Sequence, residues 1–209
     1  YFKNSYKERP LVYVVAENTS ASYDSEKNTI YTDNIPKYYQ MRLKTKDDLN
    51  QYVTFENLIK DPIGNLTFIY NTMKKDYAIC ESEYRTKRFS SEVAKEKLKD
   101  ALEEYHREIN RFKKGIDQIE YKDYVKKAFQ YMNKTFQTKL DGEHRKLTGW
   151  RLFQIVFIVS LICEMIRSEY KDDRTITEAD IEVANLLYFP TGGGKTEAFL
   201  GACVFDMFF

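Results

Sequence analysis

The chain has 209 residues, of which 43% are hydrophobic and 31% are charged, and its formal net charge is +1. This balance excludes an intrinsically disordered chain and leaves room for one medium domain or one and a half small ones. Because the net charge is close to zero, a nucleic-acid-binding surface must come from a local basic patch. The cysteines are odd in number and widely spaced, which argues against a disulfide framework or a zinc site and indicates a reducing, cytoplasmic compartment: Cys80, Cys163 and Cys203.

No membrane segment is expected from the hydropathy pattern. The longest apolar run, 152–166, is shorter than the ~20 residues of a membrane-spanning helix and contains Gln154 and Glu164. The N-terminus also lacks the basic and apolar regions of a signal peptide. Because the chain starts at Tyr1 and stops at Phe209 within an apolar stretch, we expect it to be a piece of a larger protein.

The N-terminal part alternates short apolar and polar segments. Residues 10–16 (PLVYVVA) predict one buried strand, and the polar residues 17–34 predict a loop or hairpin that includes a second short strand at 29–32. Residues 45–60 indicate a short helix, which we expect the DPIG sequence at 61–64 to break.

The middle of the chain has a strong helical pattern. Ser90 or Ser91 can cap a helix that runs to about Phe112, with Gly115 beyond its end. A second helix spans about 120–140, so the two predict an antiparallel hairpin joined around Gly115. Its apolar stripe suits a coiled-coil partner, although packing within its own domain is the favoured interpretation.

The C-terminal part carries a third helix, at about 150–168, that is apolar on nearly all sides and should therefore be buried. Thr175 or Thr177 can start a short helix, and residues 186–189 predict a buried strand that leads directly into a glycine-rich loop.

The loop TGGGKT has the composition of a phosphate-binding site. Glycines let successive backbone N–H groups point at phosphate oxygens, and a helix that starts at the loop adds its free N–H groups and positive dipole end. Lys195 would reach the β- and γ-phosphates of ATP, and Thr196 would offer its hydroxyl to a bridging Mg²⁺. The candidate phosphate-binding residues are Thr191, Gly192, Gly193, Gly194, Lys195 and Thr196.

The loop departs from the strict G-x-x-x-x-G-K-[ST] pattern, because Phe189 occupies the position of the first glycine. A glycine-rich turn without a nucleotide is the alternative. Glu197 follows in the first turn of the helix, and we expect it to have a structural role and to point away from the phosphates.

The segment WRLFQ, 150–154, provides a second candidate feature. A glutamine in an apolar helix needs a partner, since an unpaired buried amide costs ~1–3 kcal/mol. Its amide can read the edge of adenine with one donor and one acceptor. A core glutamine that backbone groups satisfy is an equally common arrangement, so both interpretations of Gln154 stand.

Three segments together resemble the first motifs of superfamily 2 helicases. FPTGGGKTEAFLGA (189–202) is similar to the form of motif I in large bacterial helicase-like proteins, above all the helicases of the DISARM anti-phage defence system. WRLFQIVFI (150–158) resembles the upstream R-x-(F/Y)-Q element that contacts adenine, and AFQYMN (128–133) resembles the segment before it. The resemblance covers about residues 125–209, and residues 1–120 show no comparable motif.

The resemblance implies a mainly α fold with an α/β edge, in which a helical accessory region leads into the first strand, P-loop and helix of a RecA-like domain. Together with the residue pattern of the N-terminal half, it gives three expected parts: a mixed α/β accessory segment at 1–89, a helical hairpin at 90–148, and an incomplete ATP-binding domain at 149–209. Gln154 would read the adenine with help from Arg151 and Phe153, while Lys195 and Thr196 would be catalytic. ATP and Mg²⁺ are the implied cofactors.

Three functions follow as hypotheses. The first is a fragment of an ATP-dependent helicase or translocase in anti-phage defence, acting on DNA in preference to RNA and within a complex with a partner protein. The second is an inactive module that docks a protein or DNA, with basic clusters at 85–88, 113–114 and 126–127. The third is a P-loop ATPase that is not a helicase, which a Gln154 buried far from the loop would favour.

The remaining reactive side chains give no site. His106 and His144 lack other ligands at metal-binding spacing. Cys203 is expected in the core rather than as a nucleophile.

Overall fold

The computed structural model describes residues 21–32, 47–86, 88–89, 91–139, 148–170 and 194–209, and 82% of these residues are helical. It divides the chain into two compact units, Tyr1–Lys44 and Thr45–Phe209. The predicted strands at 10–16 and 186–189 and the short helix near Thr175 lie outside the described residues.

In the first unit, β1 (Ser22–Asp24) and β2 (Thr29–Tyr31) pair as an antiparallel hairpin, with Tyr23 opposite Ile30. The carboxylate of Asp24 accepts hydrogen bonds from two turn N–H groups, and Asn28 takes a φ of 51°, a left-handed conformation that asparagine tolerates. The hairpin and the strand predicted at 29–32 are thus confirmed.

The second unit begins with a 3-10 helix η1 (Asp47–Val53), then α1 (Phe55–Lys60) and α2 (Pro62–Thr86). The predicted break at DPIG is confirmed, because α1 ends at Lys60 with Asp61 as its C-cap, but the helix that begins directly after the break was not predicted. Pro62 is the first residue of α2, a position where the backbone N–H has no partner within the helix, so the N–H that proline lacks is not needed. The side chain of Asp61 caps this helix by accepting a hydrogen bond from the Gly64 N–H at 3.0 Å. The same residues that end α1 therefore start a helix of 25 residues.

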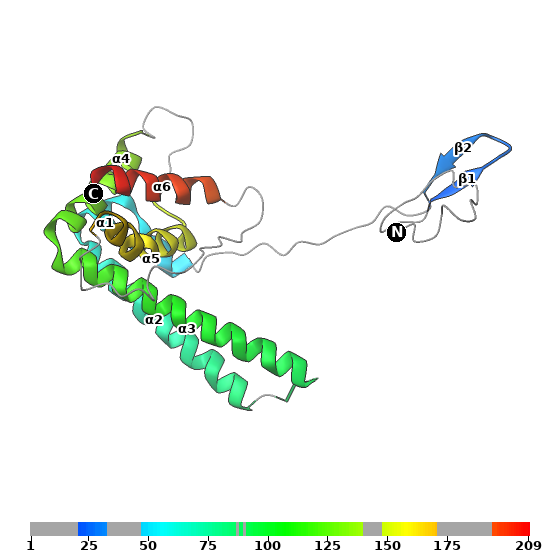
Figure 1. The fold of residues 1–209 in the computed structure, drawn as a ribbon, viewed down its shortest axis with the longest axis horizontal. Coiled ribbons are helices and arrows are strands. Elements are labelled where there is room, and N and C mark those ends of the chain that lie inside the picture. The colour runs from blue at the N-terminus through cyan, green and yellow to red at the C-terminus, as the bar shows by residue number, and fades with distance from the viewer. Residues whose placement is uncertain (1–20, 33–46, 87, 90, 140–147, 171–193) are drawn as a thin grey trace. The chain divides into compact units, whose positions relative to one another are not determined.

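The long helix α3 (Glu92–Tyr121) starts as predicted, because the hydroxyl of Ser91 accepts a hydrogen bond from the Ala94 N–H at 3.1 Å. Its predicted end at Phe112 is wrong, since the helix continues through Gly115 to Tyr121. A single residue outside both helices, Lys122, then separates α3 from α4 (Asp123–Lys139). The long antiparallel hairpin of the structure is accordingly formed by α2 and α3, which extend together from the other helices of this unit (Figure 1).

The core gathers residues from every helix of the second unit around α5 (Leu152–Glu169), which packs against α3 and against α6 (Lys195–Phe208). The predicted burial of α5 is confirmed, and its fully buried apolar side chains are Ile155, Ile158, Val159, Ile162 and Ile166. Each such side chain contributes roughly 1.5–3 kcal/mol to the free energy of unfolding. Among the described helices, none has the length and hydropathy to cross a membrane.

Gly115 marks the closest approach of α3 to α5. A Cβ atom at this position would lie 2.0 Å from the carbonyl oxygen of Val159, so only glycine fits. One turn before it, Arg111 forms a largely buried ion pair with Glu164 of α5 and a second pair with Glu108 at 3.5 Å. This glycine is therefore a packing residue and not a helix terminator, which explains why the predicted helix end was wrong.

We predict that Gly115→Ala lowers the free energy of unfolding by about 2 kcal/mol or more, because the contacted atom belongs to a helix backbone that cannot rotate away. Urea unfolding followed by circular dichroism measures this. Gly64→Ala is the matched control, since its Cβ would meet only the movable side chain of Asp61. Equal stability of the two variants would contradict the assigned packing role.

Alkaline pH should weaken the α2–α3 hairpin through Tyr105. Burial raises the pKa of Tyr105, and the nearby Asp76 carboxylate and Cys80 thiol raise it further. Above about pH 10, the folded protein therefore keeps a proton on Tyr105 that the unfolded chain loses. The contribution of Tyr105 to the free energy of unfolding is complete below that pH and is lost as the pH rises through the pKa of the folded state. Urea unfolding at pH 9 and pH 11 should show a smaller loss for Tyr105→Phe than for wild type. Tyr121→Phe, at a site that is 78% exposed, should behave like wild type.

Candidate nucleotide-binding site

The helix predicted after the glycine-rich loop is present as α6, and Gly194 precedes it as the N-cap. Gly194 has φ 90° and ψ 27°, a left-handed conformation that favours glycine. The first N–H groups of α6 have no partner within the helix and carry the positive end of its dipole. The described end of the loop is thus a left-handed glycine followed by a helix N-terminus, whereas Thr191, Gly192 and Gly193 lie outside the described residues.

The side chain of Gln154 joins the start of α5 to the end of this loop. Its Oε1 accepts a hydrogen bond from the Arg151 N–H at 2.7 Å, and its Nε2 donates one to the Gly194 carbonyl, also at 2.7 Å. The residue is only 5% exposed. Two sequence features that are 40 residues apart are thus in direct contact.

The oxygen and the nitrogen of the Gln154 amide each have a backbone partner. These bonds agree with the interpretation of Gln154 as a core glutamine that backbone groups satisfy. The amide retains a second N–H and a second lone pair. Adenine reading by Gln154 therefore stays a prediction.

The other predicted site residues surround this contact. Arg151 is exposed, and its guanidinium lies 5.8 Å from the centroid of the half-buried Phe153 ring, a cation–π distance. At the start of α6, Lys195 is half-buried and Thr196 is exposed. These four residues thus all lie at the N-terminal ends of α5 and α6, which the hydrogen bond from Gln154 connects.

The side chain of Glu197 lies close to Gly194, the described end of the loop, and its direction away from the phosphates stays a prediction. Its Oε2 lies 3.4 Å from the position that a Cβ on Gly194 would occupy. A carboxylate is stabilised there, because the N-terminal end of a helix attracts negative charge.

The close contact of α5 and α6 was not predicted. A Cβ on Gly201 would lie 2.5 Å from Ile158 Cδ1 and 2.8 Å from the Trp150 ring. The indole N–H of Trp150 donates to the buried Asn133 Oδ1 at 2.8 Å. A polar Asn133 in an apolar stripe is the sequence signal that indicates such a partner. The described parts of the three segments that carry the helicase resemblance, which belong to α4, α5 and α6, are therefore packed on one another.

Cys203 also differs from its prediction, because it lies exposed on α6 and not in the core. The residues of α6 that pack inward are Ala198, Gly201, Ala202 and Phe205, a spacing that leaves position 203 towards solvent.

We predict that Gln154→Ala releases the first turn of α6, because the Gly194 carbonyl and Arg151 N–H both lose a buried partner, at about 1–3 kcal/mol. Hydrogen exchange of the amides in that turn should accelerate. Gln130→Ala is the control: its Nε2 also donates a 2.7 Å bond to a backbone carbonyl, that of Ile59. If both variants changed exchange at α6 equally, the link would have no local role.

Comparison with known proteins gives one informative similarity. No model of a known protein family matches the chain. The chain is similar to the DISARM protein DrmA of Bacillus paralicheniformis, with 30% identity over 128 residues. The match covers 53% of this chain and 11% of DrmA, so the chain spans about a tenth of the length of that relative.

Proposed function

We propose that this chain supplies the ATP-phosphate-binding loop and its supporting helices to an ATP-dependent nucleic-acid helicase or translocase of superfamily 2, with a role in anti-phage defence. The observation that carries the proposal is the hydrogen bond from Gln154 to Gly194, which connects the R-x-F-Q element to the loop. The similarity to DrmA supports the defence role.

The described residues fit ATP and Mg²⁺ through their backbone as well as their side chains. Gly194 has the left-handed conformation in which a loop can turn its N–H groups inward, and α6 directs its N-terminal end at the same place. Lys195 would bind the β- and γ-phosphates, Thr196 would be a ligand of Mg²⁺, and the loop residues 191–193 would complete the phosphate site. The metal would supply charge neutralisation between the phosphates.

The position of Gln154 supports the helicase over other P-loop ATPases. A glutamine buried far from the loop would favour a different class of ATPase, whereas this one is buried against the loop itself. Because the chain matches a tenth of DrmA, we assign hydrolysis, movement along DNA and assembly with a defence partner to the longer protein that would carry this segment. We propose DNA rather than RNA as the substrate, because the motif resemblance to helicases of anti-phage defence implies it.

Lys195→Ala should weaken binding of Mg–ATP by about 10- to 100-fold, since a hydrogen bond to a charged phosphate contributes about 1.5–3 kcal/mol. A fluorescent ATP analogue titrated with and without Mg²⁺ measures this. In the natural sequence context of the chain, the same variant should abolish ATP hydrolysis stimulated by single-stranded DNA.

Lys97→Ala is the matched control for Lys195→Ala, because it removes an exposed lysine from α3. It should bind nucleotide like wild type. Nucleotide binding that is independent of Mg²⁺ and unchanged in Lys195→Ala would contradict the proposal.

A further inference from the structure

The exposed face of α4 carries a stripe of residues that the proposed function does not use. Its members recur at spacings of three and four and therefore lie on one side of the helix: Asp123, Lys127, Tyr131, Lys134 and Thr138. Two lysines thus lie on either side of a tyrosine whose side chain is 48% exposed. We call this set the α4 stripe.

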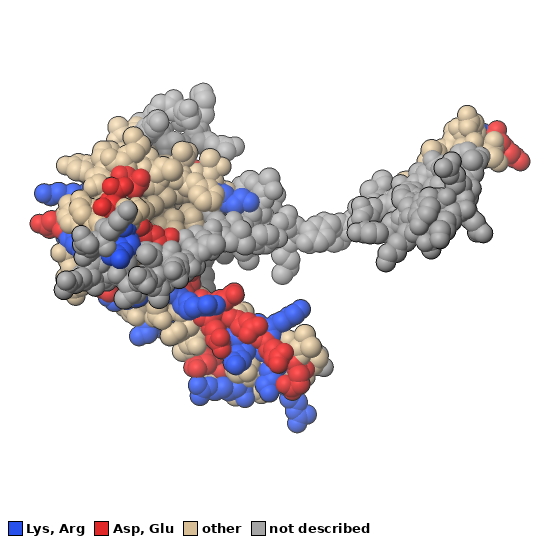
Figure 2. Space-filling model, viewed as in Figure 1, with Lys and Arg blue, Asp and Glu red and all other residues tan. Residues whose placement is uncertain are grey.

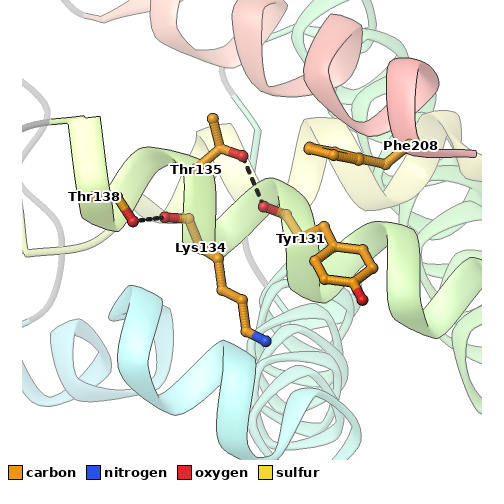
Figure 3. Close-up of a pocket in the computed structure, with 5 residues that line it drawn as sticks. All are labelled: Tyr131, Lys134, Thr135, Thr138 and Phe208. Carbon is orange, nitrogen blue, oxygen red and sulfur yellow. Dashed lines mark hydrogen bonds between the residues drawn. The ribbon is translucent and has the colours of Figure 1, made fainter.

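A pocket of about 430 Å³ lies beside the stripe, between α4 and the C-terminal end of α6 (Figure 3). Tyr131 and Phe208 line it with rings 5.5 Å apart, and Phe208 is also 48% exposed. The ammonium of Lys134 lies 5.3 Å from the centre of the Tyr131 ring. A flat aromatic group that stacks here would therefore lie next to a positive charge.

The charges of α4 differ from those of the α2–α3 hairpin. Along that hairpin, basic and acidic side chains alternate, as Figure 2 shows. Two of the three basic clusters identified in the sequence each have one cation in an ion pair of this kind, since Arg85 pairs with Glu81 and Lys113 with Asp117.

The third cluster differs. Among the ion pairs of the described part of the chain, none includes Lys126, Lys127 or Lys134. Asp123 is the one acidic side chain within α4. The α4 stripe is thus a basic surface with an exposed aromatic ring at its centre.

We propose that the α4 stripe and its pocket bind single-stranded nucleic acid. Lys127 and Lys134 contact backbone phosphates, and one base stacks on the rings of Tyr131 and Phe208. Aromatic rings within a positive groove are the usual arrangement of sites for single strands, because every base offers a flat face while the lysines follow the backbone. A duplex hides these faces, and an acidic peptide would use the lysines without the rings.

The dimensions of the stripe suit a short stretch of single strand. Lys127 and Lys134 are seven residues apart, which is about 10 Å along a helix. At about 3.4 Å per nucleotide of a stacked strand, this distance spans about three nucleotides. Tyr131 lies between the two lysines, where the middle base would stack.

The test is binding of a fluorescein-labelled oligo-dT of 12 nucleotides to the 209-residue chain, followed by anisotropy between 50 and 200 mM NaCl. Lys127→Ala/Lys134→Ala should reduce the slope of log affinity against log salt by about 1.4, since each lost phosphate contact on a single strand removes about 0.7. Tyr131→Ala should weaken binding at least about fivefold.

The controls remove the same groups elsewhere. Lys97→Ala/Lys99→Ala removes two exposed lysines from α3, and Tyr121→Ala removes a tyrosine that is 78% exposed. Both should bind the oligonucleotide like wild type. Circular dichroism of each variant verifies its fold.

Several results would overturn the proposal. The first is that the wild-type chain does not bind the oligonucleotide at 50 mM NaCl. The second is that the stripe variants and the control variants lose the same affinity. The third is that duplex DNA binds as tightly as the single strand and Tyr131→Ala changes neither affinity. The proposal is independent of nucleotide binding: Lys195→Ala should keep oligonucleotide affinity while losing Mg–ATP, and the double lysine variant of the stripe should do the reverse.

Discussion

Two glycines let α3 and α6 approach α5 closely at consecutive residues, the first against the backbone of α5 and the second against one of its side chains. A Cβ on Gly115 would lie 2.0 Å from the Val159 carbonyl, and a Cβ on Gly201 would lie 2.5 Å from Ile158 Cδ1. Because α5 is apolar on nearly all sides, most of its surface must be covered by other helices. The two glycines allow these helices to pack against α5 without leaving a void. The remaining helices of the second unit pack around this three-helix contact.

This contact also positions the candidate nucleotide site. Once Gly201 lies against Trp150 and Ile158, the N-terminal end of α6 is held beside the N-terminal end of α5, where Gln154 reaches the Gly194 carbonyl at 2.7 Å. Trp150 is fixed in turn by the buried Asn133 of α4. The geometry of the loop end therefore depends on packing well outside the loop, in which α4, α5 and α6 all take part.

The helices themselves could largely be predicted, because caps such as Ser91 and the apolar pattern of α5 are local signals. The sequence failed where one residue type has two roles. The DPIG sequence ends α1 as predicted, but Pro62 also opens α2, a helix of 25 residues that was not predicted, and Gly115 suits a helix end but serves a close contact. The residues of the candidate site were identified from motif spacing. The hydrogen bond by which Gln154 links these residues could not be predicted, since a contact between residues 40 positions apart depends on tertiary packing.

Helix α6 takes part in both proposed binding surfaces. Its N-terminal end is bonded to Gln154, and Phe208 at its C-terminal end contacts Tyr131 of the α4 stripe. The helix has 14 residues, about 21 Å at 1.5 Å per residue, and Gly201 lies near its midpoint in contact with α5. The close packing of Gly201 on Ile158 and Trp150 therefore fixes the position of both ends of the helix, and with them the residues that α6 contributes to each surface.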